Sequence, residues 1–191
     1  MGRPRTFDDE AVLSRAMEEF WTHGYACTSP AQLAEATGIA KGSLYNAFSS
    51  KRALFDRCLD LYHRHVIETT QEWMGHPGTA RECISAALKA VVDGDLAQPQ
   101  RRGCLIGNTA VELAGEDAEM SFKLRRMKDE STAWFAERIR RGQVEGDVPR
   151  DRDAQALAEH VANTLAGLRV MAMTHEAPAL HRIIDTALMA L

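Results

Sequence analysis

The chain has 191 residues and is 45% hydrophobic, which is enough apolar material for one compact domain or a small head on a larger body. Its formal net charge of −4 argues against a protein that covers nucleic acid without sequence preference, because such a protein would be strongly basic. The charge does not exclude a specific nucleic-acid-binding protein whose basic groups lie in one place. No apolar run reaches membrane-spanning length, and residues 1–10 lack the apolar segment of a secretory signal. We therefore expect a soluble cytoplasmic protein without a membrane partner.

Enzyme and metal chemistry find little support in the sequence. The GxSxG and HExxH motifs, the P-loop and the dinucleotide-binding fingerprint are absent. The histidines lack a tight ligand spacing, and the four cysteines show no CxxC pair, so we expect them to be reduced and mostly buried as small apolar residues. The sequence predicts no enzyme, no metal and no cofactor; a catalytic group assembled from distant residues is the alternative.

Helix signals dominate the chain, and no convincing strand is present. The apolar spacing and the Ser, Thr, Pro and Gly residues at the expected helix ends predict an all-α fold of about nine helices. The division into domains is predicted at residues 1–50 and 51–191. The expected helices, in chain order, span about residues 8–23, 30–37, 41–47, 51–73, 79–96, 104–114, 117–141, 154–173 and 178–191.

Residues 28–52 carry the most informative pattern, which is two short helices around a glycine turn and a capped helix after them. Gly38 can adopt the left-handed conformation of a sharp turn, and Leu44 sets the inner face of the helix that follows. This is a helix-turn-helix pattern. Its Lys and Asn side chains suit base edges of double-stranded DNA, and its Lys, Tyr and Ser side chains suit phosphates. The residues directed outward are Lys41, Gly42, Tyr45 and Asn46, with Ser43 at the margin.

Further DNA contacts are expected around this motif. The amides that begin the fourth helix, capped by Ser50, form a phosphate site beside Lys51. Arg3 and Arg5 form a short basic arm suited to the minor groove. The alternative is a helical pair with a solvated polar face, but a purely structural helix has little use for a glycine that costs about 1 kcal/mol relative to alanine. The predicted DNA-binding residues are Arg3, Arg5, Thr28, Ser29, Lys41, Gly42, Ser43, Tyr45, Asn46 and Lys51.

The N-terminal quarter of the chain resembles the TetR/AcrR family of bacterial transcriptional regulators. The residues that carry the resemblance are Phe20, Gly24, Tyr25, Thr28, Leu33, Ala34, Gly38, Ile39, Lys41, Gly42, Ser43, Leu44, Tyr45, Phe48, Lys51, Leu54 and Phe55. Residues 102–114, RGCLIGNTAVELA, and the connection over 140–148 are similar to those of one TetR branch. The resemblance implies an all-helical homodimer whose C-terminal domain binds a small-molecule effector and then releases an operator.

Two positions depart from the family pattern. Position 40, often a serine cap in the family, is Ala40, which removes roughly 1 kcal/mol of helix capping. Position 47, often a histidine or tyrosine, is Ala47, so one common phosphate contact is missing. Both departures predict DNA binding that is weaker or that depends on a partner subunit.

The last two predicted helices are apolar enough to serve as an interface between subunits. One has a seam of small alanines that lets another helix approach closely, and the other has a continuous apolar stripe. We expect a dimer interface made of two helices from each subunit; the alternative is that both helices complete the core of a single chain. The predicted interface residues are Ala158, Ala162, Ala166, Leu180, Ile184 and Leu188.

Effector contacts are harder to identify, because core and pocket residues share the same apolar chemistry. Met127 and Trp134 suit a filled core as well as a cavity. Asn108 and Glu112 lie four residues apart on a mostly apolar helix, where they anchor a ligand or brace a neighbouring helix. The charged Arg169 within an apolar helix has the same ambiguity. The predicted ligand-binding residues are Cys104, Asn108, Met127 and Trp134.

Cys104 is the sharpest of these candidates. It follows Arg101 and Arg102 at the start of a helix, and both the cations and the helix N-terminus favour the reactive thiolate. Relatives that resemble this segment include sensors of electrophiles or oxidants, so the resemblance implies a thiol-based sensor as one alternative. An inert small residue at a helix start is the other.

The predicted function is a ligand-responsive DNA-binding transcriptional regulator, in the first place a repressor. A helical enzyme and a nucleoid-associated DNA protein are the alternatives from other classes. The acidic net charge and the large helical body speak against the second.

Overall fold

The computed structural model describes residues 9–191, which form nine α-helices and one short 3-10 helix with no strand among them. The predicted all-α class and number of helices are confirmed. Arg3 and Arg5, the predicted basic arm, lie outside the described residues. The elements are α1 (Asp9–His23), α2 (Pro30–Thr37), α3 (Lys41–Phe48), α4 (Lys51–Gly75), α5 (Ala80–Ala97), α6 (Leu105–Leu113), α7 (Ala118–Glu145), α8 (Ala154–Met171), α9 (Ala177–Ala187) and the 3-10 helix η1 (Leu188–Ala190).

Side-chain caps set where the helices around the turn begin. The Ser29 hydroxyl accepts a hydrogen bond from the Gln32 amide at 3.2 Å, and the Gln32 side chain accepts one from the Ser29 amide at 2.8 Å. This reciprocal pair satisfies amides that the first turn of α2 leaves without a helical partner. Ser50 caps α4 in the same way by accepting from the Ala53 amide at 3.0 Å. Both helix starts agree with the prediction.

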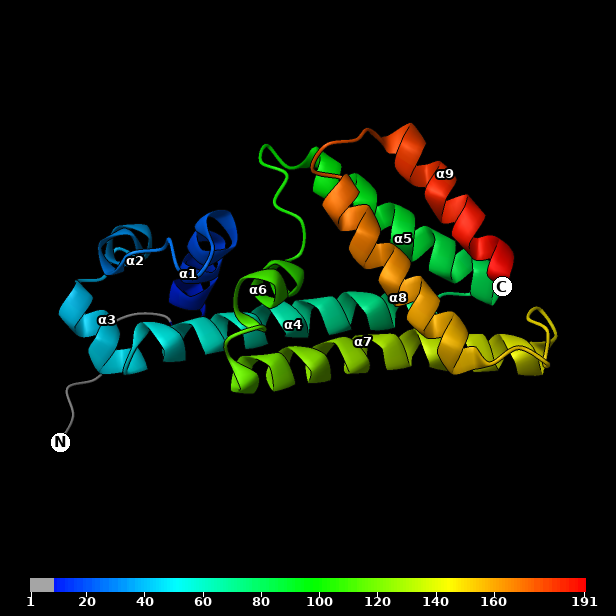
Figure 1. Ribbon diagram of the computed structural model, residues 1–191, viewed down its shortest axis with the longest axis horizontal. Helices are drawn as coiled ribbons and strands as arrows, with labels where there is room; N and C mark the ends of the chain where they lie inside the picture. The colour runs from blue at the N-terminus through cyan, green and yellow to red at the C-terminus, as the bar shows by residue number, and fades with distance from the viewer. Residues whose placement is uncertain (1–8) are drawn as a thin grey trace.

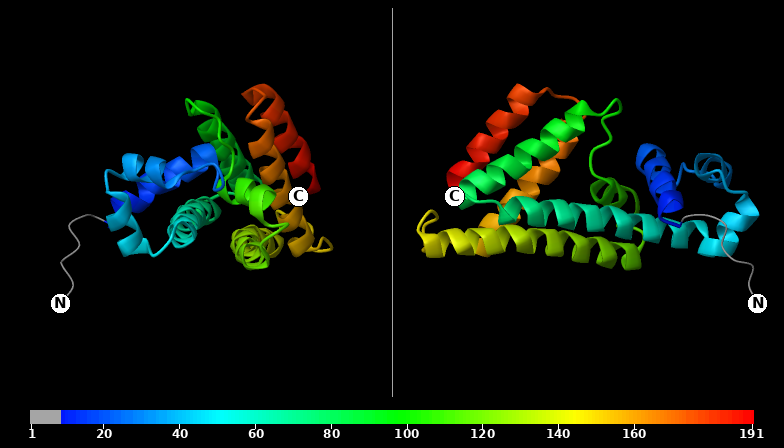
Figure 2. Two further views of the ribbon diagram at one scale, coloured as in Figure 1. Left: turned by 60° about the vertical axis from the view of Figure 1, so that its left-hand side comes forward. Right: turned by 180° about the vertical axis from the view of Figure 1, so that it is seen from behind.

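Helices α1, α2 and α3 form a head at one end of the molecule, and α5, α8 and α9 form a body at the other end (Figure 1). Helix α4 extends from the head into the body, and α7 lies beside it and runs in the same direction (Figure 1 and Figure 2). Helix α6 lies over α4 between the head and the body (Figure 1). Helix α6 and the start of α4 therefore adjoin the head.

The head does not close its own core. Phe20, Leu33 and Leu44 have no exposed surface, and they belong to an apolar cluster that extends beyond α1–α4. Helices α6 and α7 thus cover apolar surface that the head and α4 leave open. The residues they contribute to this cluster are Leu105, Ile106, Met120, Leu124 and Met127.

Most of the predicted dimer stripe lies inside the body. Ala158, Leu180 and Ile184 have no exposed surface and Leu188 is 3% exposed, because these side chains join the apolar core formed with α5 and α7. The four residues complete the core of a single chain, which corrects their assignment to a subunit interface. Ala162 is half-buried and Ala166 is exposed on α8.

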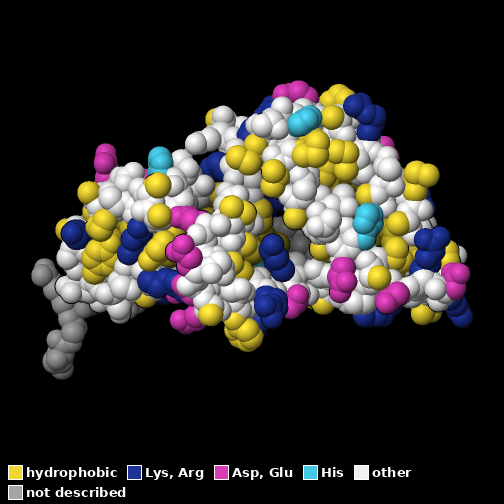
Figure 3. Space-filling view, viewed as in Figure 1, with side chains coloured by type: hydrophobic (Ala, Val, Ile, Leu, Met, Phe, Trp, Pro, Cys, Tyr) yellow, Lys and Arg dark blue, Asp and Glu magenta, His cyan; other side chains and the backbone are white. Residues whose placement is uncertain are grey.

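The outer face of the last two helices carries other apolar side chains. Val170 near the end of α8 is 65% exposed, and Met189 in η1 is 74% exposed. Figure 3 shows hydrophobic side chains on the surface over α8 and α9. The periodicity of these helices therefore identified their inner face, while the outer face holds a smaller apolar set.

Gly142, in the last part of α7, has no room for a side chain. A Cβ there would lie 2.9 Å from the Ala80 Cβ and 3.0 Å from Val148 Cγ2, and it would also meet the Asp147 carboxylate. Asp147 is held in place because its other oxygen accepts from the Ala80 amide at 2.9 Å. We predict that Gly142→Ala lowers the free energy of unfolding by about 1–3 kcal/mol, as measured by urea unfolding.

Gly94→Ala is the matched control. Gly94 also lies inside a helix, but a Cβ there would meet nothing within 4 Å. This variant should gain up to about 1 kcal/mol from the better helix propensity of alanine. A Gly142→Ala protein as stable as its parent would contradict the tight packing described for α7.

Candidate DNA interface and ligand pocket

The turn between α2 and α3 has the geometry of a helix-turn-helix. Gly38 lies in the left-handed region with φ 71°, and its amide donates to the Glu35 carbonyl at 3.2 Å. Residues with a side chain rarely adopt this conformation, so glycine suits the position. Leu33 before the turn and Leu44 after it are fully buried, which holds α2 and α3 against one core.

The outer surface of α3 presents four of the predicted DNA-reading residues. Lys41, Gly42, Ser43 and Asn46 are exposed. A Cβ at Gly42 would meet nothing within 4 Å, so a nucleic-acid backbone has room to approach the helix there. Ala40 occupies the N-cap position without a side-chain hydrogen bond, as the sequence predicted.

Three other predicted contacts are placed differently. Thr28 has no exposed surface and its hydroxyl donates to the Gly24 carbonyl at 2.6 Å; it braces the loop before α2, which corrects its assignment as a DNA contact. The Ser29 side chain is committed to the cap of α2. The Tyr45 hydroxyl is buried and has no hydrogen-bond partner among residues 9–191, so contact with a phosphate requires the ring to turn outward. Burial raises the pKa of Tyr45, with a smaller effect from Tyr25, so the phenol stays protonated as a donor.

Lys51 lies in the first turn of α4, after the α3 helix. Its Nζ is 4.5 Å from the centre of the Tyr25 ring and 3.5 Å from the Ala26 carbonyl oxygen. These contacts place the cation over the loop between α1 and α2, beside the amides that begin α4. A helix N-terminus with a neighbouring cation is the kind of site that binds phosphate.

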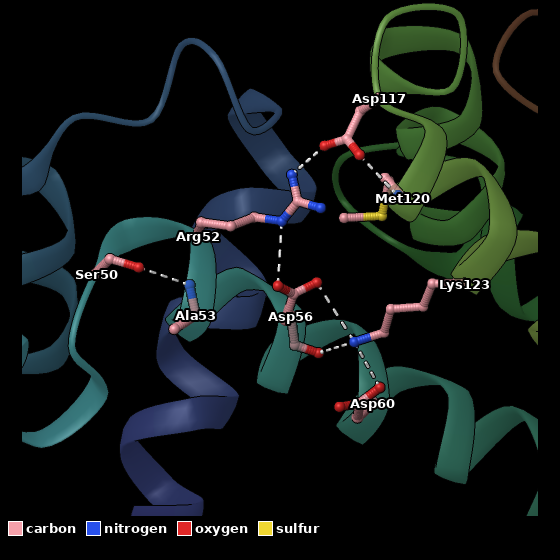
Figure 4. Close-up of polar contacts among 8 residues, drawn as sticks. All are labelled: Ser50, Arg52, Ala53, Asp56, Asp60, Asp117, Met120 and Lys123. Atoms are coloured by element: carbon pink, nitrogen blue, oxygen red, sulfur yellow. Dashed lines mark hydrogen bonds and ion pairs between the residues drawn. The ribbon is translucent and has the colours of Figure 1, made fainter.

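An ion-pair network ties the start of α4 to α7 (Figure 4). Arg52 pairs with Asp117, the N-cap residue of α7, and with Asp56 at 3.1 Å. The Lys123 Nζ lies 2.8 Å from the Asp60 carboxylate and 3.4 Å from that of Asp56. The hydrogen bond from Arg52 lowers the pKa of Asp117, which keeps the cap charged. The network positions the first turns of α4, which follow α3, against α7.

Glu112 on α6 holds the head from the other side. Its carboxylate accepts hydrogen bonds from the backbone amides of Tyr25 at 3.0 Å and Ala26 at 2.6 Å. Both amides belong to the loop between α1 and α2, and Gly24 lies against the same carboxylate. Of the two roles that the sequence left open for Glu112, the bracing role is the one observed.

A third link joins α1 to the segment before α6. The indole N–H of Trp21 donates to the Gly103 carbonyl at 3.1 Å. The Arg102 guanidinium lies 4.3 Å from the centre of the Trp21 ring and 2.6 Å from the Glu18 carboxylate. Helix α1 is therefore attached to the segment that leads directly into Cys104.

A pocket of about 550 Å³ lies between the head and the body. Its walls combine side chains of α1, α4, α5, α7 and α8 with the segment over 98–103. This volume is in the range of small-molecule sites. Because Glu18 and Trp21 of α1 belong to the wall, a molecule in the pocket touches the head directly.

The predicted effector contacts do not line this pocket. Met127 is buried in the core shared by the head, α6 and α7, and Trp134 packs against the body core. Asn108 is exposed, and its side-chain amide donates to the Arg102 carbonyl at 2.8 Å. These three residues therefore lie outside this pocket, and Met127 lines the second hollow described below. Apolar periodicity does not separate a filled core from a hollow one.

Cys104 lies beside the pocket and begins α6. Its Sγ accepts a hydrogen bond from the Gly107 amide at 3.4 Å, which caps the helix. It also accepts one from the hydroxyl of Tyr62 at 3.6 Å, and Tyr62 is part of the pocket wall. A change at the thiol therefore reaches the pocket through one side chain.

Arg169 on α8 is the polar centre of the pocket. Its Nε and Nη2 donate to the two carboxylate oxygens of Asp95 at 2.8 Å each. Its Nη1 donates to the Tyr62 hydroxyl at 2.8 Å, and Nη2 also donates to the Gly103 carbonyl at 2.9 Å. Burial raises the pKa of Tyr62 above its usual value, so its hydroxyl keeps the proton that it donates to Cys104. The charged Arg169 in an apolar helix was the sequence signal for this site.

The rest of the described chain forms a second, more polar hollow but no cluster of metal-ligating side chains. A second hollow of about 490 Å³ lies against α4 and α7 and is lined mostly by charged side chains, including those of the Arg52 network. Within residues 9–191, no group of three or more His, Cys, Asp or Glu side chains is arranged to hold a metal ion. Over the same residues, no helix is both long and apolar enough to cross a lipid bilayer.

Two family models match the chain over its head and its body. The model for bacterial regulatory proteins of the tetR family matches residues 12–58, and the model for the tetracyclin repressor-like C-terminal domain matches residues 78–187. The chain belongs to the TetR family. It is a DNA-binding transcriptional regulator, and the helix-turn-helix described above is its DNA-binding element.

This TetR-family chain is similar to relatives over its full length. It is 30% identical over 194 residues to the uncharacterized HTH-type transcriptional regulator YezE of Bacillus subtilis (strain 168), with all of both chains covered. It is 27% identical over 187 residues to the HTH-type transcriptional repressor ComR of Escherichia coli (strain K12), which covers 97% of this chain and 88% of ComR. The TetR family transcriptional regulator CifR, solved as a cysteine mutant complexed with 26-base-pair double-strand operator DNA, has a TM-score of 0.89 and 35% identity over 98% of this chain and 99% of that chain.

We predict that Glu112→Ala frees the loop between α1 and α2. The Tyr25 and Ala26 amides would lose their shared acceptor, so their hydrogen exchange should accelerate at least about tenfold, since a charge-assisted hydrogen bond contributes about 1.5 kcal/mol or more. The matched control is Glu116→Ala, which removes an exposed carboxylate just after α6. Unchanged exchange of both amides in Glu112→Ala would contradict the bracing role.

Proposed function

We propose that this TetR-family regulator is a cytoplasmic repressor that binds a palindromic operator as a homodimer and leaves it when a small molecule binds, without catalysing a reaction. The observation that carries the proposal is the shared pocket wall, in which Met17, Glu18 and Trp21 of the head face the same hollow as the body. An occupant contacts both parts at once. The names of two relatives support the proposal: ComR is a repressor, and CifR was solved on operator DNA.

Release requires an effector that binds the DNA-free arrangement more tightly than the DNA-bound one. The contacts between Trp21 and Gly103 and between Glu18 and Arg102 lie in the pocket wall. An occupant that spreads this wall displaces α1 from the segment before α6. Because Glu112 near the other end of α6 holds the loop before α2, the displacement also reaches the helix-turn-helix.

A second copy of the chain accounts for the apolar outer face of α8 and η1. Val170 and Met189 are exposed there, and Ala162 and Ala166 allow a partner helix to approach closely. A two-fold dimer presents two recognition helices to one side of a duplex, at about 34–36 Å or a related spacing. Such a dimer predicts a palindromic operator.

The operator proposal is tested by selection from random DNA and footprinting. A palindromic site should be bound in preference to random DNA at physiological salt. Asn46→Ala should weaken binding to that site by about 1–3 kcal/mol, because this is the usual contribution of an amide paired with a base edge. The control Gln71→Ala removes an exposed amide far along α4 and should bind like the parent. Equal affinity of the parent for the selected site and random DNA would end the proposal.

A thiol sensor of the same fold is the second candidate, and the position of Cys104 favours it. The half-buried Sγ caps α6 and accepts from the Tyr62 hydroxyl, which in turn accepts from Arg169. A group added to the sulfur would remove the cap and push Tyr62 into the pocket. The modified thiol would then displace α1 through the same contacts in the pocket wall as a bound effector.

We predict that N-ethylmaleimide, whose C=C bond is attacked by a thiolate, releases the parent protein from its operator and that Cys104→Ser abolishes this release. Serine keeps an acceptor at the start of α6, so operator binding without the reagent should be unchanged. Cys27→Ser is the matched control, because Cys27 is the exposed cysteine of the head. Release that persists in Cys104→Ser but is lost in Cys27→Ser would remove the thiol-sensor candidate.

A further inference from the structure

We infer that the pocket beside Arg169 selects an electrically neutral effector with an apolar, flat body and a hydrogen-bond donor at one end. The inference rests on the proposed small-molecule response and adds the chemical class of the molecule. It follows from three observations: the wall is largely apolar, each carboxylate in it pairs with a guanidinium group, and the Tyr62 oxygen beside Arg169 has a free acceptor position.

The body of the pocket is apolar and partly aromatic. Such a wall favours a ligand that gives up little hydration and that can lie flat against indole and phenyl rings. The chief apolar side chains of the wall are Trp21, Val66, Trp73, Leu88, Phe135 and Leu165.

The carboxylate and guanidinium groups of the wall neutralise one another in ion pairs. The wall contains two carboxylates, Glu18 and Asp95, and two guanidinium groups, Arg102 and Arg169. Arg169 and Asp95 form a two-point pair at 2.8 Å, and their side chains are only 13% and 12% exposed. Arg102 pairs with Glu18 at 2.6 Å. The wall also contains His65, whose side chain is exposed.

This pairing penalises a charged ligand of either sign. An anion that took the Nε and Nη2 edge of Arg169 would displace Asp95 and leave that carboxylate without its partner in a mostly buried place. A cation that took the place of Arg169 on Asp95 would leave the guanidinium in the same state. A neutral molecule loses less hydration on entry and leaves both pairs intact.

The polar end of the pocket accepts hydrogen bonds. The Tyr62 oxygen accepts one bond from Arg169 and donates its proton to Cys104, so one of its lone pairs stays available. Tyr62 lines the pocket beside Arg169. An O–H or N–H group on the ligand is therefore the complementary feature.

Three naphthalene probes of nearly one shape test the inference. They are 2-naphthamide, 2-naphthoate and 2-naphthamidinium, which are neutral, anionic and cationic at pH 8. Binding to the full chain is measured by calorimetry at this pH, above the usual titration range of histidine. We expect 2-naphthamide to bind at least about tenfold more tightly than either charged probe. Tighter binding of a charged probe, or no heat from 2-naphthamide up to its solubility limit, would overturn the inference.

Asp95→Asn supplies a second test, because it removes the charge that neutralises Arg169 while keeping a side chain of similar shape. The variant should bind 2-naphthoate about tenfold more tightly than the parent does, which narrows the preference for 2-naphthamide. Asp93→Asn is the matched control, because Asp93 lies on the same helix but pairs with His181 outside the pocket. An unchanged probe preference in a folded Asp95→Asn protein would also overturn the inference.

The calorimetry separates this inference from the proposed function. If 2-naphthamide binds with the expected preference but leaves operator binding unchanged, the charge class of the pocket stands and the proposed coupling to DNA fails. If no operator is found, the calorimetric ranking still decides the class of ligand.

Discussion

The head cannot bury its own apolar surface, and the other features of the molecule depend on this constraint. Helices α2 and α3 have eight residues each, a length that is not stable as an isolated helix in water. They are held by burial of Leu33 and Leu44 in a cluster that α4, α6 and α7 complete. The position of the DNA-reading helix is therefore set by how the body packs against the head.

The same constraint explains where the pocket lies. Packing closes the contact between head and body along α4, α6 and α7, while the space between α1, α5 and α8 stays partly open. Arg169 crosses this space, and a buried guanidinium needs acceptors, which Asp95, Tyr62 and the Gly103 carbonyl provide. The segment over 101–104 serves both this network and the attachment of α1, so ligand chemistry and head position share one short stretch of chain.

Features that depend on neighbouring residues were predictable from the sequence, and features that depend on distant ones were not. The helix boundaries, the turn at Gly38 and the missing cap at Ala40 follow from local capping and turn preferences. The apolar stripe from Leu180 to Leu191 was predicted as a subunit interface, but its side chains at Leu180, Ile184 and Leu188 are buried within the chain. Periodicity does not say whether a face packs within its chain or against a partner. The pocket joins Trp21 to Arg169 across most of the chain, and only the charge of Arg169 in an apolar helix pointed to it.

The energies of the contacts indicate which part of the molecule can move. Removing the head from α6 and α7 would expose several fully buried side chains, at about 1.5–3 kcal/mol each. A nearly complete switch between two states requires a difference in effector affinity of about 5.5 kcal/mol, so opening the shared core is too costly for one small molecule. The peripheral links cost far less. The ion pair of Arg102 with the half-exposed Glu18 contributes about 1 kcal/mol, and the amides held by Glu112 can be hydrated when released. In the response proposed above, the shared core stays closed as a pivot, and the effector exchanges one set of weak peripheral links for another as the head turns about that core.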